Sequence, residues 1–333
     1  MRVDADEKGP SVRAVRFHET GGPEVLRIDE VDDPTPGPGE ILVEVAAAGV
    51  NFIDTYQRGG IYPMSLPSGL GLEGAGVVRA VGEGVTHRRE GDRVAWSDQL
   101  GSYAGLVTLA ADRTVVVPDG VDLDIAAALM LQGMTAHYLS SSTYKLGSDD
   151  TILLYAAAGG VGRLLLQLAK RRGARVLACT STPEKAEEVR RLGADEIVFY
   201  RDVDVARTVR ELTDGQGVDV VYDSVGVDTF ESSLDCLRPR GMLVLFGASS
   251  GPVPPFDPQV LNRKGSLFLT RPTLGHYVAT RDELEWRAHA LFELVGQGQL
   301  EVHVHGRYPL DEVQRAHTDL ESGETAGKLL LQP

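Results

Sequence analysis

Short apolar runs alternate with amphipathic stretches through the second half of the chain. The apolar run Ile152–Tyr155 leads into small residues, then into an amphipathic stretch, and then into a second apolar run at Val176–Cys179. Short apolar runs bounded by turns predict buried strands, and a repeat of 3.6 residues predicts a helix. Six strands are predicted here: Thr151–Tyr155, Arg175–Cys179, Glu196–Tyr200, Val218–Asp223, Met242–Phe246 and Ser266–Thr270.

Helices are predicted between most of these strands, with Pro183 at a first helical position and Gly173 as a stop signal. Strands that alternate with helices indicate a parallel, doubly wound α/β sheet with helices on both faces. A further helix is predicted after Arg281, and then short strands. The remaining predicted elements are the helices Val161–Arg172, Pro183–Leu192, Asp204–Thr213, Asp228–Leu237 and Leu310–Leu320, and a last strand at Lys328–Gln332.

The first third of the chain has a different pattern, typical of a β-rich domain. Ile41–Val45 alternates between apolar and polar residues, Gly74–Val81 is a glycine-rich strand, and Asp92–Trp96 is another short strand. Pro34–Gly39 and Glu83–Gly84 supply the breaks between them.

Composition narrows the class of protein. With 333 residues, 42% of them hydrophobic and 24% charged, the chain can build two domains with sizeable cores. No apolar run approaches the roughly 20 residues that a membrane helix needs. Met1–Pro10 is polar and of mixed charge, which predicts a tail and not a secretory signal. Cys179 and Cys236 lack metal-type spacing, so a reducing, cytoplasmic location is expected.

The turn Ala157–Gly162 carries the most specific local signal. It reads AAGGVG between a strand and a helix, the unit that places a pyrophosphate on a helix N-terminus. Small residues let the backbone approach phosphate, and Gly162 lets the helix pack against the strand. The first Gly of the usual GxGxxG pattern is replaced by Ala157, so the flanking strands carry the argument. The alternative is a tight turn in another doubly wound protein.

Six segments then occur in one order along almost the whole chain. They are GVNFIDTYQRGGIYP (Gly49–Pro63), LPSGLGLEGAGVV (Leu66–Val78), LQGMTAHYL (Leu131–Leu139), AAAGGVG (Ala156–Gly162), VVYDSVG (Val220–Gly226) and LTRPTL (Leu269–Leu274). Together they resemble the medium-chain dehydrogenase/reductases, and within them the zinc-independent, zeta-crystallin-like NADPH:quinone oxidoreductases. The resemblance implies a GroES-like catalytic domain split around an inserted Rossmann domain, with the active site in the cleft between them. The expected parts are a tail at 1–10, catalytic residues 11–132, a Rossmann domain at 133–275 and a catalytic part at 276–333.

The resemblance also implies the absence of a metal. Zinc-dependent relatives carry Cys, His and a third ligand where this chain has Asn51, Leu72 and the Leu131–Gln132 pair. Zinc needs a tetrahedral set of N, S or carboxylate donors, and Glu73 and Asp54 alone make a poor one. His137 is expected to be a helical residue that hydrogen bonds satisfy. We therefore expect no metal.

The end of the second Rossmann strand bears on the choice of coenzyme. NAD enzymes usually present an acid to the ribose at this point, whereas Cys179–Lys185 places hydroxyls there and Lys185 one helical turn further. Hydroxyls and an ammonium favour a 2′-phosphate, so NADPH is expected. In similar reductases the matching Lys and the Tyr after the third strand, here Tyr200, contact that phosphate. Lys328 is a further candidate, and the alternative for both lysines is a solvated side chain.

The resemblance also supplies the expected catalytic residues, Asn51, Asp54 and Tyr56. Hydride transfer to a quinone makes an oxyanion that becomes aromatic, so the site needs orientation and a hydrogen-bond donor more than a strong acid. Tyr56 and Asn51 are the preferred donors. The alternatives are that Tyr56 only packs and that Asp54 caps a helix.

The expected cofactor residues lie mostly after the predicted strands. They are Asn51, Tyr56, Gln132, Thr135, Ala158, Gly159, Gly160, Val161, Ser181, Lys185, Tyr200, Ser224, Phe246, Gly247, Ser249, Leu269, Thr270, Arg271 and Lys328. For Gly247, a plain strand-to-turn glycine is an equally good interpretation.

Three functions follow from these observations. The leading hypothesis is NADPH-dependent reduction of quinones. The second is reduction of the C=C bond of α,β-unsaturated carbonyls, and Met64 and Ser65, where relatives often have prolines, leave the substrate range open. The third is an RNA-binding or structural crystallin-like role. The net charge of −15 repels nucleic acid and anionic membranes and argues against RNA binding, and a purely structural role would not need the intact cofactor positions. Relatives are usually homodimers that join through the last Rossmann strand, here Ser266–Thr270.

Overall fold

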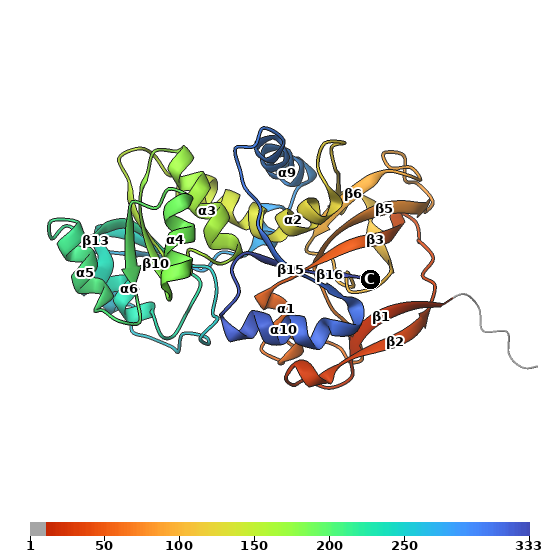
Figure 1. Cartoon of the computed structure of the whole chain (residues 1–333), viewed down its shortest axis with the longest axis horizontal. Helices are drawn as coiled ribbons and strands as arrows, with labels where there is room; N and C mark the ends of the chain where they lie inside the picture. The colour runs from red at the N-terminus through yellow and green to blue at the C-terminus, as the bar shows by residue number, and fades with distance from the viewer. Residues whose placement is uncertain (1–10) are drawn as a thin grey trace, which may run out of the picture. The chain divides into compact units, whose positions relative to one another are not determined.

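The structure, a computed structural model, describes residues 11–333, and the predicted tail at 1–10 lies outside the described residues. Two compact units are found. The first comprises the described chain up to Leu131 together with Leu284–Gly296 and Val304–Pro333. The second comprises Gln132–Glu283 and Gln297–His303 (Figure 1). The long helix α2, Leu123–Tyr138, therefore begins in the first unit and ends in the second.

The first unit is built on a seven-stranded sheet and a three-stranded sheet. The larger sheet has the order β15-β16-β3-β5-β6-β8, with β7 also paired to β3, and the smaller has the order β2-β1-β4. The strands are β1 Ser11–Phe17, β2 Leu26–Asp32, β3 Glu40–Val50, β4 Ser68–Gly69, β5 Glu73–Val81, β6 Arg93–Ser97, β7 Leu106–Ala110, β8 Thr114–Val116, β15 Val304–Pro309 and β16 Lys328–Gln332. Its helices besides α2 are α1 Phe52–Arg58, α9 Arg281–Gly296, which enters this unit at Leu284, and α10 Val313–Ser322, with 3-10 turns at Pro23–Val25, Ala111–Arg113 and Leu310–Glu312.

The C-terminal strand completes the sheet that the first third of the chain begins. β16 pairs antiparallel with β3, with Leu330 opposite Gly49. Side chains that alternate inward from β3, such as Ile41 and Val43, are buried in the same apolar core as Leu329. The two ends of the chain thus belong to one compact unit, and most of the second unit is inserted between them in the sequence.

The second unit is a parallel six-stranded sheet in the order β11-β10-β9-β12-β13-β14. The predicted α/β doubly wound sheet is therefore confirmed. Its strands are β9 Thr151–Leu154, β10 Arg175–Thr180, β11 Glu196–Phe199, β12 Val218–Asp223, β13 Leu237–Leu245 and β14 Phe268–Thr270. Its helices are α3 Gly160–Arg171, α4 Pro183–Arg191, α5 Val205–Leu212, α6 Phe230–Cys236, α7 Gln259–Arg263 and α8 Leu274–Tyr277, and a π-helical turn covers Leu139–Thr143.

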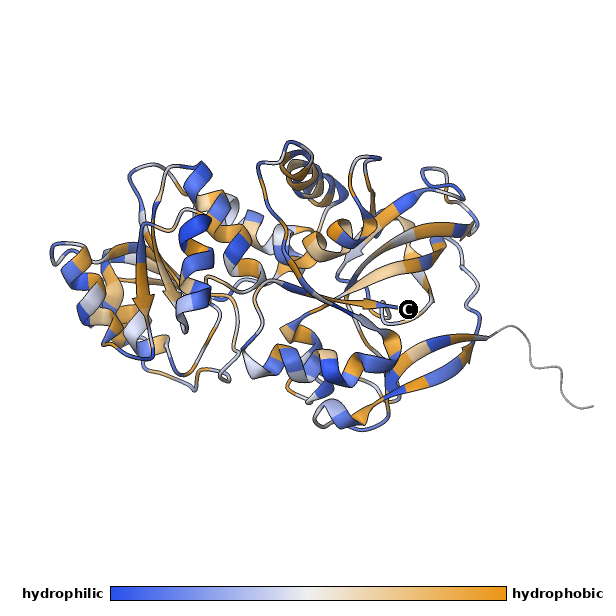
Figure 2. Ribbon diagram, in the orientation of Figure 1, coloured by the Kyte–Doolittle hydropathy of each residue, from blue (hydrophilic) through white to orange (hydrophobic). Residues whose placement is uncertain are grey.

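The burial of each element follows its sequence pattern. The strands of the second unit are mainly hydrophobic and α4 is mainly hydrophilic (Figure 2). The last four of the six residues of β12 are all buried, as expected for a strand covered on both faces. The helix α3 buries its leucines, whereas Lys170 in its last turn is half-buried and Arg171 is exposed, so its amphipathic pattern is confirmed.

The fifth strand of this sheet differs from its prediction. It is predicted at Met242–Phe246, whereas β13 begins at Leu237. Its register against β12 is irregular between the pairs Val218–Leu237 and Val220–Met242, and Arg240 between them has a φ of +60°. Strands rarely contain proline or glycine in their interior, and this strand contains both, next to a residue with a left-handed backbone conformation. Its first half therefore has the sequence pattern of a turn.

Among residues 11–333, no helix is both long enough and apolar enough to cross a membrane.

Candidate functional site

The carboxyl ends of the six parallel strands bring most of the expected cofactor residues to one edge of the second unit. Because β9 to β14 run in the same direction, the residues that follow them share that edge. The chain moves from β9 toward β11 on one side and returns through β12 on the other, which makes the end of β9 the switch point where such sheets bind nucleotides. This edge collects Ala158, Gly159, Gly160, Val161, Ser181, Lys185, Tyr200, Ser224, Phe246, Gly247, Ser249 and Arg271.

The glycine turn after β9 is shaped for close approach. The helix α3 starts at Gly160 with Gly159 as its N-cap, and a Cβ on Gly162 would collide with the carbonyl oxygen of Ala156. Gly162 is therefore needed for the helix to pack closely, although its neighbours are Ala156 and Ala157 of the turn and not residues of the strand itself. A Cβ on Gly160 would collide with the side-chain amide of Gln132, so this amide lies against the first turn of α3. The first amides of the helix have no acceptor within it and can bind an anion.

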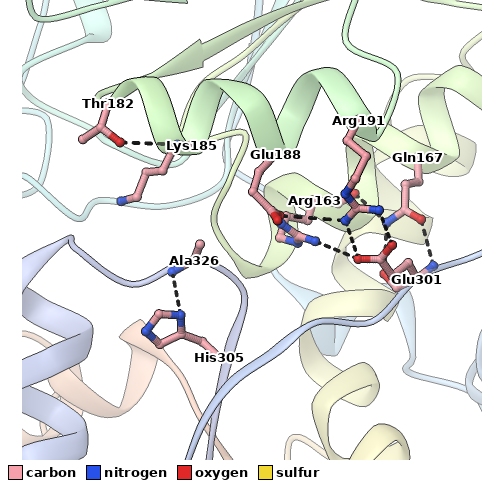
Figure 3. Close-up of polar contacts among 9 residues, drawn as sticks. All are labelled: Arg163, Gln167, Thr182, Lys185, Glu188, Arg191, Glu301, His305 and Ala326. Atoms are coloured by element: carbon pink, nitrogen blue, oxygen red, sulfur yellow. Dashed lines mark hydrogen bonds and ion pairs between the residues drawn. The ribbon is translucent and has the colours of Figure 1, made fainter.

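The ends of β10 and β11 form the second part of this edge. Thr180 pairs with Phe199, so Ser181 and Tyr200 each follow the last paired residue of adjacent strands. The Thr182 side chain caps α4 by accepting the Lys185 backbone N–H at 3.3 Å (Figure 3). Lys185 is half-buried, and no carboxylate lies between the end of β10 and the start of α4.

One cation at this edge is absent from the prediction. The guanidinium of Arg201 lies 5.7 Å from the centre of the Tyr200 ring, a cation–π geometry. Its position directly after Tyr200 in the sequence is the signal that could have identified it.

The loop after β12 is held by a buried carboxylate. Asp223, fully buried at the end of β12, accepts hydrogen bonds from the Val225 N–H at 2.8 Å and from the Thr229 and Ser233 hydroxyls at 2.7 Å each. This anchor fixes Ser224, the first residue of the loop. A Cβ on Gly247 would collide with the Ser224 carbonyl, so Gly247 has a structural role in addition to any contact with a cofactor. Asp223 lies within the VVYDSVG segment, but its anchoring role is absent from the prediction.

The residues expected to be catalytic lie in the first unit, around the start of α1. The Asn51 amide oxygen accepts a hydrogen bond from Lys328 Nζ at 2.8 Å. The Asn51 amide nitrogen donates to Glu73 Oε2 at 2.8 Å and to the Gly49 carbonyl at 3.2 Å. Lys328 also forms an ion pair with Glu73, and both side chains are buried, at 1% and 0% exposure. The other Glu73 oxygen accepts the Leu131 N–H at 2.6 Å.

These contacts change two of the expected roles. Both hydrogens of the Asn51 amide are engaged inside the protein, so the structure does not support Asn51 as a donor to a substrate oxyanion. The charge of Lys328 is matched by Glu73 in a buried position, so the structure does not support Lys328 as a ligand of the adenosine phosphate. Both residues instead belong to one buried polar network.

Asp54 caps α1, as one of its two interpretations states. It accepts the Asn51 backbone N–H at 2.8 Å and the Tyr103 hydroxyl at 2.7 Å on the same oxygen, Oδ2. Its other oxygen, Oδ1, is buried without a hydrogen-bond partner among the described residues. Burial raises the pKa of Asp54 to about 7.

The raised pKa predicts a stability effect of Asp54→Asn that depends on pH. Because the folded pKa lies above the unfolded value of 3.8, the folded protein retains a proton that the unfolded chain releases, and the contribution of Asp54 to stability falls as the pH rises from about 4 to about 7. The variant lacks this titration. Between these two pH values, the difference in unfolding free energy should therefore move in favour of Asp54→Asn by ~1.4 kcal/mol for each unit of pH. Urea unfolding of both proteins at several pH values measures it, and a difference independent of pH would contradict it.

His317 is a buried imidazole in the same unit, and it titrates in the opposite sense. Burial first, and then the Arg58 guanidinium 2.9 Å from Nδ1, lower the pKa of His317 to about 3. The unfolded chain therefore takes up a proton at His317 between about pH 6.5 and 3, which lowers stability as the pH falls. Comparing Asp54→Asn with the wild type cancels the His317 contribution, because it is common to both proteins.

The aromatic residue expected as a donor lies on the exposed side of α1. Tyr56 is half-buried, and its ring meets that of Tyr62 edge to face, with centroids 5.7 Å apart. Tyr56 thus belongs to a small aromatic group on the GVNFIDTYQRGGIYP segment. In the second unit, Thr135 is buried on α2, while Leu269 and Thr270 at the end of β14 are half-buried.

Candidate metal ligands do not gather within residues 11–333, where no group of three or more His, Cys, Asp or Glu residues could hold a metal ion. Cys179 and Cys236 are buried free thiols, and burial raises the pKa of Cys236 to about 12. His137 is buried on α2, with Nδ1 3.4 Å from the Ser141 hydroxyl, in line with its expected role.

Known proteins match both parts of this chain. Residues 160–293 match the family model described as zinc-binding dehydrogenase, and residues 37–140 match that of the alcohol dehydrogenase GroES-like domain. A quinone oxidoreductase from Pseudomonas aeruginosa is 49% identical over 96% of this chain and 99% of its own length. A 2-haloacrylate reductase from a Burkholderia species is 43% identical over 97% of this chain and 99% of its own.

A solved structure agrees with the fold. The crystal structure of Escherichia coli quinone oxidoreductase complexed with NADPH has a TM-score of 0.95 and 46% identity, and it covers 96% of this chain and 100% of its own. The parallel sheet with its glycine turn, the split β-rich domain and these full-length similarities lead to one conclusion: the chain belongs to the quinone oxidoreductases of the medium-chain dehydrogenase/reductase superfamily.

Proposed function

We propose that this protein is a reductase that transfers a hydride from NADPH to a quinone without a metal. The observation that carries the proposal is the acid-free end of β10, with Ser181 and Lys185 on the same sheet edge as the glycine turn. Full-length similarity to quinone oxidoreductases, one of them solved in complex with NADPH, supports it.

The residues at the sheet edge fit the parts of NADPH. The free amides at the start of α3 suit the pyrophosphate, and Ser181, Lys185, Tyr200 and Arg201 offer hydroxyls and cations for the 2′-phosphate. Backbone groups after β13 and β14, at Phe246–Ser249 and Leu269–Arg271, suit the carboxamide. When bound, NADPH supplies the hydride.

Reduction of a quinone requires little acid catalysis from the protein. A quinone that accepts a hydride becomes a phenolate, and one proton completes the hydroquinone. The hydroquinone ring is aromatic, so water can provide this proton, and the protein needs only to orient the reactants and stabilise the oxyanion. We assign the stabilising donor to the Tyr56 hydroxyl. Asp54, Asn51 and the Lys328–Glu73 pair hold the start of α1, which carries Tyr56.

Independence from zinc belongs to the same proposal. Lys328 already supplies a cation to Glu73 and Asn51, and the apolar Leu72 cannot donate to zinc. Stoichiometric zinc found by elemental analysis of the active protein would contradict this part of the proposal.

Reduction of activated C=C bonds is the second candidate, and the 43% identity to a 2-haloacrylate reductase favours it. The same hydride donor serves both reactions. Turnover of 1,4-benzoquinone, 9,10-phenanthrenequinone, 2-alkenals and 2-chloroacrylate should be measured side by side with NADPH. We expect kcat/KM for the quinones to exceed that for the alkenes by about tenfold or more, a difference of about 1.4 kcal/mol. Higher values for the alkenes would replace the leading proposal with the second.

We propose that the protein is a homodimer and that it is located in the cytoplasm. β14 is the last strand in the order of its sheet, and Phe268 on it is 57% exposed, so a second copy can pair at this edge. The mass in solution tests this. The net charge of −15 opposes RNA binding, and a shift assay at physiological salt tests that alternative.

A further inference from the structure

Four charged residues of the second unit form a cluster that joins α3, α4 and the segment Gln297–His303 (Figure 3). Arg163 of α3 pairs with Glu188 of α4, and its Nη2 lies 3.0 Å from Glu301 Oε1. Arg191 of α4 binds both oxygens of Glu301, at 2.6 and 2.7 Å. Glu301 therefore receives two guanidinium groups from two different helices.

The backbone of the segment is fixed at the same point. The Gln167 side chain accepts the Glu301 N–H at 2.8 Å and donates to the Glu301 carbonyl at 3.0 Å. These two bonds hold the main chain of residue 301 against α3. The position of the Glu301 carboxylate is therefore set by its backbone as well as by its ion pairs.

The burial of Arg163 makes its ion pairs important for the position of α4. Arg163 is 2% exposed, and a buried guanidinium is stable only when carboxylates compensate its charge. By contrast, α4 buries only Ala186 and Val189 among its nine residues. Two small side chains give a short helix little apolar anchorage, so the ion pairs from Glu188 and Arg191 are a main determinant of where α4 lies.

The placement of α4 bears on the proposed coenzyme site. Arg163 lies in the first turn of α3, directly after the glycine turn that suits the pyrophosphate. Glu188 lies one turn after Lys185, which suits the 2′-phosphate. The cluster thus ties together the two helices whose starts hold these two parts of one coenzyme.

We propose that Arg163, Glu188, Arg191 and Glu301 are positioning residues for coenzyme specificity. They hold α4 so that Lys185 reaches the 2′-phosphate while the pyrophosphate lies at the start of α3. The inference rests on the proposed use of NADPH. In this proposal the cluster acts on the coenzyme only through Lys185.

The test compares Glu301→Gln with the wild type in binding titrations of NADPH, NADH, 2′,5′-ADP and 5′-AMP. We expect the Kd of NADPH and of 2′,5′-ADP to rise about tenfold, equivalent to ~1.4 kcal/mol, with little change for NADH and 5′-AMP. Loss of a carboxylate near the site would by charge alone tighten phosphate binding, so weaker binding separates positioning from a field effect. Equal weakening of all four ligands, or tighter NADPH binding, would overturn the inference.

A double-mutant cycle with Lys185→Met gives a second readout. Once Lys185 is absent, Glu301→Gln should change NADPH binding little, whereas fully additive losses would contradict action through Lys185. Glu211→Gln removes an equal charge from the exposed ion pair with Arg207 on α5, and it should leave all four affinities unchanged. If Glu301→Gln fails to fold, Arg191→Lys keeps the charge but loses the two-pronged contact, and it carries the same expectation.

The titrations of the wild type and of the cluster variants also separate this inference from the proposed function. A wild-type protein that binds NADPH and NADH equally would refute the proposed coenzyme. A wild type that prefers NADPH, with a preference unchanged in both cluster variants, would refute the inference alone.

Discussion

Lys185→Glu should lower kcat/KM for NADPH about 100-fold and leave kcat/KM for NADH nearly unchanged. The ammonium of Lys185 is assigned to the 2′-phosphate, and a charge-assisted hydrogen bond contributes about 1.5–3 kcal/mol. A carboxylate at the same position adds repulsion to that loss. NADH lacks the phosphate, so only the general effect of one changed charge remains. Initial rates with 1,4-benzoquinone at varied coenzyme concentrations measure both values.

Lys145→Glu is the matched control, since it makes the same charge change in the same unit. Lys145 precedes β9 and so lies toward the amino ends of the strands, away from the proposed coenzyme edge. It should leave both kcat/KM values unchanged. An equal fall for NADPH and NADH in Lys185→Glu would mean that Lys185 supports the fold or the common part of the coenzyme, and would contradict its assigned role.

Breaking the buried Lys328–Glu73 pair should destabilise the first unit strongly. Lys328→Met leaves the Glu73 carboxylate without its cation at a fully buried position, and loss of one partner of such a pair costs about 3–5 kcal/mol. Glu73→Gln instead leaves the Lys328 ammonium buried without its carboxylate, and it should lower the unfolding free energy by a similar amount. The double variant removes both charges while Gln can still accept hydrogen bonds, so it should be more stable than either single variant. Urea unfolding measures all four proteins of this cycle.

An exposed pair provides the comparison. Lys170 and Asp195 form an ion pair at about a third exposure, and Lys170→Met should cost less than about 1 kcal/mol. A double variant at Lys328 and Glu73 whose loss equals the sum of the single losses would show that the two charges do not compensate each other, contrary to the network described here.

The sequence pattern predicts most strands of the second unit, because each strand is encoded by a short stretch of neighbouring residues. Each parallel strand is a short apolar run, and the residue that follows it reaches the same edge whatever the rest of the chain does. The glycine turn and the acid-free end at Ser181 could therefore be located without a structure. The observed bounds of several elements differ from the predicted ones by a residue or two. The predicted start of β13 was wrong, because Pro239 and Arg240 interrupt a regular strand.

The buried network of the first unit could not be predicted because it depends on pairing between distant segments. Lys328 and Glu73 are 255 residues apart, and they meet only because β16 joins β3. Without that pairing, Lys328 is a lysine near the C-terminus, for which a phosphate contact and a solvated side chain are both open. Arg163 and Glu301, 138 residues apart, carry no local signal either, since charged side chains on a helix and in a loop are usually solvated.

The central claim is that the protein uses NADPH to reduce quinones, and the ratio of kcat/KM for NADPH to kcat/KM for NADH tests it most directly. It should be measured for the wild type with 1,4-benzoquinone, after treatment with a metal chelator. We expect turnover to survive the chelator and the ratio to exceed about 100, equivalent to ~2.7 kcal/mol. A ratio near one, or loss of turnover with the metal, would contradict the account.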